Sequence, residues 1–185
     1  MPKRSYQNEF RIIAGTWRSR RCTFPPRKGL RPTPDRVRET LFNWLGSRIE
    51  GARCLDLFAG SGALGLEALS RGAGRVVFVE RDREAVQGIE ANLARLNAAG
   101  AEVAPMEALD YLANTDEAFD VAFLDPPFGS GLLDLAVEPL RERLRPDARI
   151  YLEFPMTAGP PPLPPGWRLL KSSKAGQVGY GLAAI

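Results

Sequence analysis

The sequence predicts an α/β fold in which helices cover both faces of a central, mostly parallel sheet. From residue 53 onward, short apolar runs alternate with segments of helical periodicity, the order expected of β–α units. The apolar runs are nearly continuous, as in strands that are buried on both faces. Near the C-terminus, two adjacent strand-like runs around a short turn break this rhythm. A chain of 185 residues can bury one substantial core.

The N-terminal part precedes this alternation. Residues 9–24 read as two short β-type runs joined near Gly15. Thr33 is expected to cap a helix whose first residue is Pro34, because threonine is a common N-cap and proline is favoured at the first helical position. Apolar residues then recur at helical spacing and predict one buried face: Val37, Leu41, Trp44 and Leu45.

The remaining elements follow in order from residue 53. Strands are expected over residues 53–59, 75–80, 101–106, 118–125 and 148–154. Helices are expected over residues 62–71, 82–98 and 131–143. A proline-rich connection over 159–166, which stiffens a loop, leads to the final strands over 167–174 and 176–185.

The charge of the chain is distributed unevenly. Residues 1–40 contain eleven Lys and Arg against three Asp and Glu, whereas residues 41–185 contain fourteen against nineteen. A basic segment on a mildly acidic body favours a polyanionic partner, and we expect that partner to be nucleic acid. The alternative is a solvated basic surface without a partner.

The composition excludes several kinds of chemistry. The chain contains no histidine, so Ser-His-Asp and Cys-His catalysis are excluded and the commonest transition-metal ligand is missing. Cys22 and Cys54 show neither a disulfide framework nor metal-ligand spacing, so we expect no metal, and Cys54 suits a small core position. Because no run of about 18 apolar residues and no signal peptide is present, we expect a cytoplasmic protein without a membrane partner.

A glycine-rich turn predicts a cofactor site. Gly60, Gly62 and Gly65 lie between a strand and a helix, where they allow a ligand to approach the helix N-terminus closely. Glu80 ends the next strand, where it can accept hydrogen bonds from ribose hydroxyls. The same glycine spacing is the fingerprint of dinucleotide-binding proteins, so NAD is an alternative cofactor. Asp56 favours S-adenosylmethionine (SAM), because a carboxylate there suits a cationic ligand and repels a diphosphate.

The segment Asp125-Pro126-Pro127-Phe128 follows an apolar strand. Proline keeps the preceding residue extended and has no N–H, so the segment offers a rigid carboxylate, free carbonyls and an aromatic face. An exocyclic amine is a poor nucleophile because its lone pair is delocalised into the base. Two acceptors can bind its hydrogens and direct the lone pair towards a methyl donor, while Phe128 stacks on the base. The alternative is a proline-punctuated strand end with a half-buried phenylalanine.

These motifs resemble those of known methyltransferases. The segment "DLFAGSGALG" resembles motif I of the class I SAM-dependent methyltransferases, and "DPPF" resembles motif IV of the amino-methyltransferases. "RIIAGTWRSRRCTFP", "GLRPTPDRVRETLFNWL" and the terminal "KAGQVGYGL" resemble the bacterial 16S ribosomal RNA (guanine-N2)-methyltransferase family, the D-type small-subunit rRNA methyltransferases. The resemblance covers nearly the whole chain. Gly179 departs from it, since a histidine or another polar residue is expected there.

The resemblance implies a Rossmann-like class I methyltransferase fold. It implies a seven-stranded, mostly parallel sheet with helices on both faces and a C-terminal antiparallel strand, preceded by a small basic β-hairpin and helix extension. It further implies that SAM is the cofactor and that the substrate is one guanine N2 in small-subunit rRNA, naked or in an assembling 30S subunit. We expect a monomer with an RNA-binding arm over residues 1–32 and a methyltransferase domain over residues 33–185.

The resemblance and the residue types together predict the site residues. The base is expected to be held by Asp125, Pro126, Pro127 and Phe128. The residues expected at the cofactor are Asp56, Phe58, Gly60, Gly62, Glu80, Arg81, Glu107 and Ala108. The residues expected to contact RNA are Arg11, Trp17, Arg18, Arg20, Arg21, Arg31 and Arg38. The arginines would bind phosphates. Trp17 could instead pack in the core, and Arg38 could instead pair within the protein.

Other functions stay open at this point. The chain is small for a DNA methyltransferase acting on adenine N6 or cytosine N4, which usually needs a separate target-recognition region. A protein-glutamine methyltransferase would usually carry N-P-P-Y rather than D-P-P-F. A non-catalytic RNA-binding assembly factor would have no reason to retain the intact Asp125–Phe128 segment.

Overall fold

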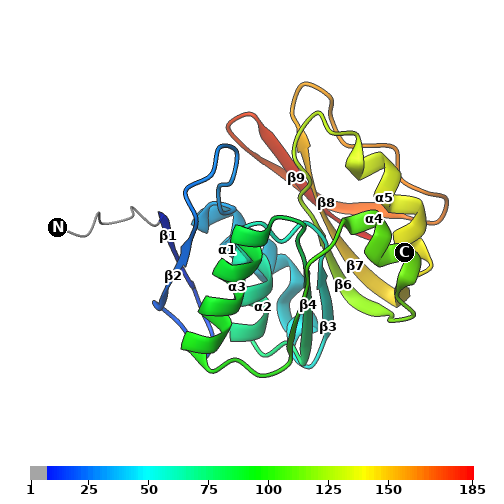
Figure 1. The fold of residues 1–185 in the computed structure, drawn as a ribbon. Helices are drawn as coiled ribbons and strands as arrows, with labels where there is room; N and C mark the ends of the chain where they lie inside the picture. Colours follow the sequence, from blue (N-terminus) through cyan, green and yellow to red (C-terminus); the bar gives the residue numbers. More distant parts are fainter. Residues whose placement is uncertain (1–7) are drawn as a thin grey trace.

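A computed structural model describes residues 8–185 of the chain, and residues 1–7 of the predicted arm lie outside the described residues. The strands of the large sheet are β3 (Arg53–Asp56), β4 (Arg75–Val79), β5 (Ala101–Ala104), β6 (Phe119–Leu124), β7 (Leu144–Pro155), β8 (Arg168–Ala175) and β9 (Val178–Ala184). Their order in the sheet is β5-β4-β3-β6-β7-β9-β8 (Figure 1). The strands from β5 to β7 are parallel, and β9 is antiparallel to both of its neighbours. The predicted seven-stranded sheet with one antiparallel strand near the C-terminus is confirmed.

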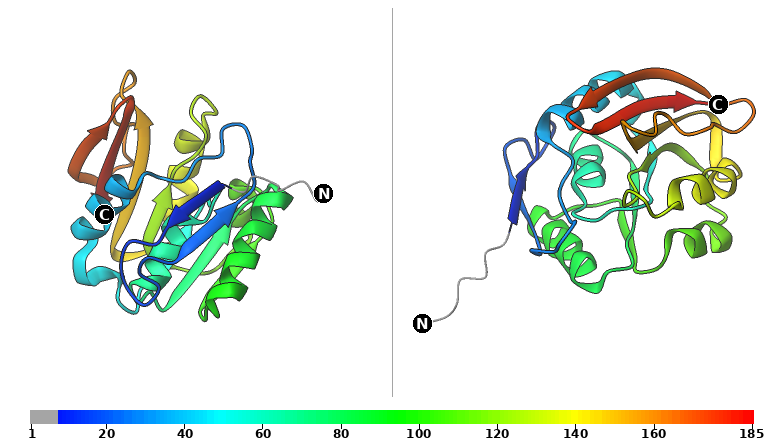
Figure 2. Two further views of the ribbon diagram at one scale, coloured as in Figure 1. Left: turned by 90° about the vertical axis from the view of Figure 1, so that its left-hand side faces the viewer. Right: turned by 90° about the horizontal axis from the view of Figure 1, so that it is seen from above.

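Helices cover both faces of this sheet. They are α1 (Asp35–Leu45), the 3-10 helix η1 (Gly46–Ile49), α2 (Ala63–Ser70), α3 (Arg83–Leu96), α4 (Ala108–Asn114) and α5 (Leu132–Arg141). Successive strand residues point to opposite faces, so Cys54 joins one core with α1, α2 and α3, whereas Leu55 joins the other with α4 and α5 (Figures 1 and 2). The sequence did not predict α4, which has only seven residues and follows the short strand β5 closely.

The N-terminal hairpin packs on the body of the protein. Its strands β1 (Asn8–Arg11) and β2 (Arg21–Phe24) pair antiparallel and lie beside α3 (Figure 2). The side-chain amide of Asn92 on α3 makes two hydrogen bonds with the backbone of Thr23 in β2: its Oδ1 accepts from the Thr23 N–H at 3.1 Å, and its Nδ2 donates to the Thr23 carbonyl at 2.8 Å. Gly15 is required at the turn, because a Cβ there would lie 1.8 Å from the Ser70 carbonyl oxygen. The hairpin therefore has a fixed position on α2 and α3.

The start of α1 differs from the prediction by one residue. Pro34 is the N-cap, Asp35 is the first helical residue, and Thr33 makes no capping hydrogen bond. Thr33 is instead buried, and its carbonyl accepts from Arg38 Nε at 3.0 Å. It therefore takes part in a tertiary contact with α1 rather than in capping this helix.

Candidate active site

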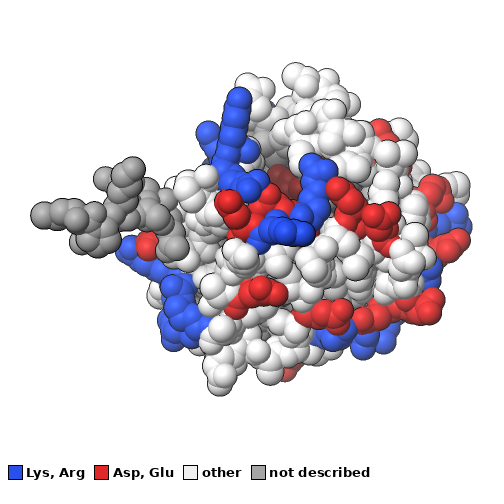
Figure 3. Space-filling view, viewed as in Figure 1, with Lys and Arg blue, Asp and Glu red and all other residues white. Residues whose placement is uncertain are grey.

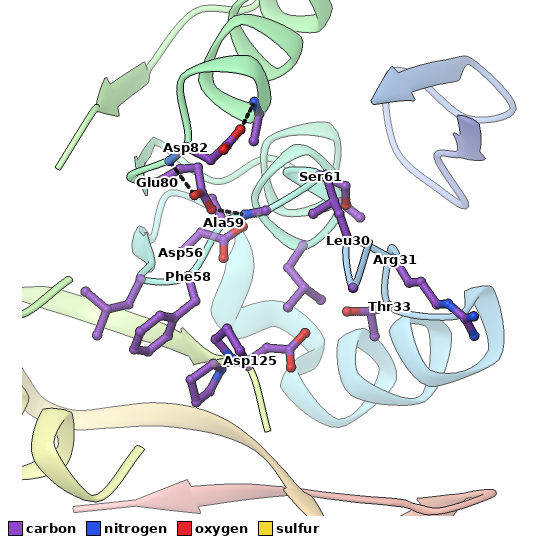
Figure 4. A pocket seen from close by; sticks show the side chains of 18 of the residues that line it. Leu30, Arg31, Thr33, Asp56, Phe58, Ala59, Ser61, Glu80, Asp82 and Asp125 are labelled. Carbon is purple, nitrogen blue, oxygen red and sulfur yellow. Dashed lines mark hydrogen bonds between the residues drawn. The ribbon is translucent and has the colours of Figure 1, made fainter. Parts of the chain in front are cut away.

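A cavity of about 670 Å³ opens at the carboxyl ends of the parallel strands, where open α/β sheets bind their ligands. Loops that follow β3, β4, β5 and β6 line it, together with the segment 27–34 that joins the hairpin to α1 (Figure 4). The cavity brings together seven of the eight residues predicted at the cofactor, all but Gly62, and all four predicted to hold the base. Gly62 lies behind the wall as the N-cap of α2.

The glycine turn exposes the beginning of α2 to this cavity. Gly60 and Gly62 both have positive φ angles, 54° and 77°, which glycine adopts without strain. Gly65 has a packing role instead, because a Cβ there would lie 2.2 Å from the Phe78 ring. The predicted motif is thus a tight turn followed by close packing of α2 on β4.

Asp56 is a buried carboxyl group at the end of β3. Only 2% of the residue is exposed, and its Oδ2 accepts from the Gly65 N–H at 3.0 Å. Burial raises the pKa of Asp56 to about 7; the Gly65 hydrogen bond opposes this rise and the nearby Glu80 carboxylate adds to it. A cationic ligand group in the cavity would stabilise the ionised form of this side chain.

Glu80 organises the loop on the other side of the turn. Its Oε2 accepts from the Gly60 N–H and its Oε1 from the Asp82 N–H, both at 2.8 Å (Figure 4). Each carboxylate oxygen keeps a further acceptor site, so Glu80 can still bind a pair of vicinal hydroxyls. Arg81 and Glu107 form an ion pair at 3.2 Å beside it, with Ala108 at the start of α4. Together these residues form a subsite suited to a nucleoside.

Asp125 lies across the cavity, at the end of β6 (Figure 4). Burial, the neighbouring Glu153 carboxyl and Asp56 together raise the pKa of Asp125 well above its ordinary value. Pro126 is buried, whereas Phe128 is 49% exposed and presents its ring at the cavity. The predicted carboxylate and aromatic face therefore border the same space as the glycine turn.

Glu153 belongs to the site and was missed from the sequence. It lies near the end of β7, is 8% exposed and lines the cavity. Tyr151 donates its hydroxyl to Glu153 Oε1 at 2.6 Å. The only signal in the sequence is an acidic residue at the end of an apolar strand, "IYLEFP", directly beside the strand that ends in Asp125.

The segment 27–34 was also missed as part of the cavity wall. The Leu30 side chain lies 3.0 Å from the position that a Cβ of Gly60 would take. Arg27 forms ion pairs with Asp82 and with Glu84, the latter at 3.2 Å. The chain that leaves the basic hairpin is thereby tied to the loop that carries the nucleoside subsite.

Most of the predicted RNA contacts are exposed on the hairpin. Arg18 and Arg20 are exposed, as is Arg31 at the cavity. Arg11 and Arg21 are exposed but lie 3.6 Å from Asp35 and 3.1 Å from Glu9, respectively. Figure 3 shows basic and acidic side chains next to one another at the edge of a hollow, with acidic side chains also inside it. Of these arginines, Arg31 lines the cavity, whereas Arg18 and Arg20 lie in the hairpin turn, which is bound to Ser70 at the C-terminal end of α2.

Arg38 and Trp17, which were also predicted to contact RNA, are not exposed on the surface. Arg38 was predicted to contact RNA, and this is wrong: its side chain is fully buried and pairs with Glu67 at 3.3 Å and Asp35 at 2.6 Å. A guanidinium that is paired on all sides inside the protein cannot reach a phosphate. Trp17 is half-buried and packs against the first core, which fits the alternative of hairpin packing.

The arrangement suits a cationic ligand bound beside an amine. Asp56, Glu80 and Asp125 supply carboxyl groups, and the Asp125–Phe128 segment adds acceptors and an aromatic face. Within residues 8–185, no three His, Cys, Asp or Glu side chains gather in a way that could hold a metal ion. In the same range, every helix is too short or too polar to cross a membrane.

Comparison with known proteins places this site in a family. The family model described as conserved hypothetical protein 95 matches residues 10–183. The ribosomal RNA small subunit methyltransferase D of Escherichia coli K12 is 46% identical over 183 residues, which are 98% of this chain and 92% of that protein. The solved structure of yhhF from Escherichia coli is 44% identical and superposes with a TM-score of 0.89, over 96% of this chain and 98% of that one.

A more distant structure was solved with ligands. It is a Thermus thermophilus 16S rRNA N2 G1207 methyltransferase in complex with AdoMet and guanosine, 25% identical with a TM-score of 0.68. The match covers 96% of this chain and 49% of that one. From the family match and the close relatives, this chain belongs to the conserved hypothetical protein 95 family and to the family of the ribosomal RNA small subunit methyltransferases D.

Proposed function

We propose that this protein transfers the methyl group of SAM to the exocyclic N2 amine of one guanine in small-subunit rRNA. The observation that carries this proposal is the position of Asp125 and Phe128, which border the same cavity as the glycine turn. A relative that is 46% identical is named as a small-subunit rRNA methyltransferase, which supports the substrate class.

The cavity fits SAM in its size and in the charge of its walls. Asp56 would face the cationic methionine part, and Glu80 would accept hydrogen bonds from the ribose hydroxyls. Arg81, Glu107 and Ala108 would flank the adenine. When bound, SAM supplies a methyl group on a positively charged sulfur. The protein has only to bind this group and place the acceptor amine beside it.

Asp125 and Phe128 would position that amine. The carboxyl group of Asp125 and the carbonyl of Pro126 would accept its two N–H bonds, each worth about 1–3 kcal/mol. Phe128 would stack on the base and fix its plane, worth roughly 1–3 kcal/mol. Positioning in this way lowers the barrier chiefly by removing rotational and translational freedom. No histidine is needed, because the cationic sulfur makes the methyl group reactive.

The basic hairpin supports an RNA substrate. Arg31 is exposed at the cavity and Arg18 and Arg20 are exposed in the turn of the hairpin, where they could bind phosphates and orient the strand without reading its sequence. We propose that residues 1–32 act as an RNA-binding arm of a monomeric cytoplasmic enzyme, and that the substrate is naked rRNA or an assembling 30S subunit.

A substrate panel tests the function directly. Purified protein is incubated with SAM labelled in its methyl group and with naked 16S rRNA, 30S subunits, DNA or total protein. We expect label in rRNA alone, recovered as N2-methylguanosine after digestion to nucleosides. Label in N6-methyladenine or N4-methylcytosine of DNA, or in protein glutamine, would overturn the guanine proposal. Failure to bind SAM would leave the non-catalytic assembly factor as the better explanation.

A further inference from the structure

We propose that Glu153 is a positioning residue that receives, through Asp125, the proton released by the acceptor amine. This inference rests on the proposed methyl transfer and names the destination of its proton. Strands β6 and β7 are parallel with Leu124 opposite Leu152, so the next residue of each strand lies at the same edge of the sheet. Asp125 and Glu153 are these two residues, and both line the cavity.

The surroundings of Glu153 stabilise a buried negative charge at its carboxyl group. Only 8% of the residue is exposed. Tyr151 donates its hydroxyl to Oε1 at 2.6 Å. A buried carboxylate that accepts a hydrogen bond is more easily kept ionised than one without a donor.

Further ionisable groups lie around the pair, and the cations Arg27, Lys28, Arg31 and Arg81 line the same cavity. Asp56 faces the pair from the end of β3, and Tyr180 of β9 lies opposite Glu153 in the strand register. Two adjacent carboxyl groups, one buried and one half-buried, cannot both ionise easily without a cation beside them. Burial raises the pKa values of both, and the Tyr151 hydroxyl opposes the rise only at Glu153. In the proposed arrangement the pair shares one proton, which Asp125 carries because the Tyr151 hydroxyl stabilises charge on Glu153.

This arrangement provides a balanced route for the proton. As the N2–methyl bond forms, the methyl–sulfur bond breaks and its electron pair stays on sulfur. The amine nitrogen becomes positive and loses one proton to the free oxygen of Asp125. Asp125 passes its own proton to Glu153 and ends neutral, as it began, while Glu153 ends protonated. One proton has left the amine and one negative charge on the protein has been neutralised.

The pH dependence of Glu153→Gln tests this role. In the wild type, kcat falls on the acid side when Glu153 becomes protonated. In the variant the like charge is gone, so Asp125 ionises at lower pH and accepts the proton itself. We expect the acid limb of kcat to move to lower pH by about one unit or more, with the Kd for SAM changed less than about twofold. Glu90→Gln, an exposed position on α3, is the matched control.

A purely structural role gives a different result. It would lower kcat by the same factor at every pH and leave the acid limb in place, and this outcome would overturn the proposal. The two failures can be told apart. If the wild type transfers no methyl group to guanine, the proposed function is wrong; if the wild type is active but the acid limb of kcat does not move in Glu153→Gln, only the role of Glu153 is wrong.

Infrared spectroscopy of the ligand-free protein provides a second test that needs no activity. The spectra are recorded in an Asp56→Asn background, because burial raises the pKa of Asp56 to about 7. We expect a band of one protonated carboxyl group at pH 7 that disappears in both Asp125→Asn and Glu153→Gln, since the remaining carboxyl group then ionises. A band that survives either substitution, or is missing from the background protein, contradicts the shared proton.

Discussion

Arg38 and Glu67 form an ion pair in which both side chains are completely buried, with Arg38 Nη1 3.3 Å from Glu67 Oε2. Glu67 also accepts from the Ile13 and Ala14 N–H groups, at 2.9 and 3.1 Å, and from Arg71 Nε at 2.7 Å. One carboxylate on α2, the helix that follows the glycine turn, thus connects the turn of the hairpin with α1. The RNA-binding part and the cofactor part of the proposed enzyme share this anchor.

Glu67→Gln is therefore expected to be strongly destabilising. The substitution removes the fully buried countercharge of Arg38 and leaves it only the half-exposed Asp35. Breaking a buried ion pair typically lowers the free energy of unfolding by about 3–5 kcal/mol. Urea denaturation measures the change. Glu9→Gln is the control, because the Glu9–Arg21 pair is exposed and should contribute less than about 1 kcal/mol. A loss for Glu67→Gln as small as that of the control would contradict the role of Glu67 as an anchor.

SAM binding is expected to depend on pH through Asp56. Only the ionised carboxylate attracts a cationic ligand. As the pH rises towards 7, the Kd for SAM should therefore decrease by up to about tenfold per pH unit, and above pH 7 it should level off. Calorimetry should detect proton release on binding at pH 6, and Asp56→Asn should remove both effects. A pH-independent Kd in the wild type would show that Asp56 does not titrate with the ligand.

The same group affects the stability of the ligand-free protein. Because the pKa of Asp56 is raised to about 7 on folding, the native state binds more protons than the unfolded chain between about pH 4 and 7. Wild-type stability should consequently fall relative to Asp56→Asn as the pH rises through this range, and level off above it. Thermal unfolding of both proteins at pH 4, 6 and 8 measures the difference. A difference that does not change with pH would contradict the raised pKa.

Phe128 is expected to act on the substrate rather than on the fold. Its ring is 49% exposed, so Phe128→Ala should leave the melting temperature nearly unchanged. Loss of stacking should reduce kcat/KM for RNA by about 10- to 100-fold, which corresponds to roughly 1–3 kcal/mol, without changing the Kd for SAM. Leu135→Ala, an exposed apolar residue on α5, is the matched control. Equal effects of the two substitutions would exclude stacking by Phe128.

The exposed hairpin arginines should set the salt dependence of RNA binding. Replacing Arg18, Arg20 and Arg21 with Gln should weaken binding and reduce the slope of log Kd against log salt by about two to three. Arg141→Gln on α5 controls for a general loss of positive charge. If the slope for the triple variant equals the slope for Arg141→Gln, the hairpin does not bind phosphates.

The parts of the site that depend on local sequence could be predicted, and those that depend on distant packing could not. The glycine turn and the Asp125–Phe128 segment each lie in one loop beside a strand, so their chemistry is visible in consecutive residues. Glu153 is 28 positions beyond Asp125 and becomes its neighbour only through the register of β6 and β7. Sequence reasoning cannot supply that register.

Arg38 shows the opposite error. In the sequence it is one more cation in a basic stretch, and it was counted among the RNA contacts for that reason. Its burial requires Glu67, which lies 29 residues away on another helix. Thr33 does not cap α1 either: Pro34 is the N-cap, and the buried Arg38 binds the Thr33 carbonyl.

The most direct test of the proposed function is single-turnover methylation of guanine N2 by Asp125→Asn and the wild type. Both proteins are saturated with SAM and mixed with the rRNA substrate, and N2-methylguanosine is quantified over time. We predict that Asp125→Asn binds SAM with a Kd within about threefold of the wild type but forms product at least about 100-fold more slowly. Equal rates of N2-methylguanosine formation by the two proteins would contradict the assignment of this site.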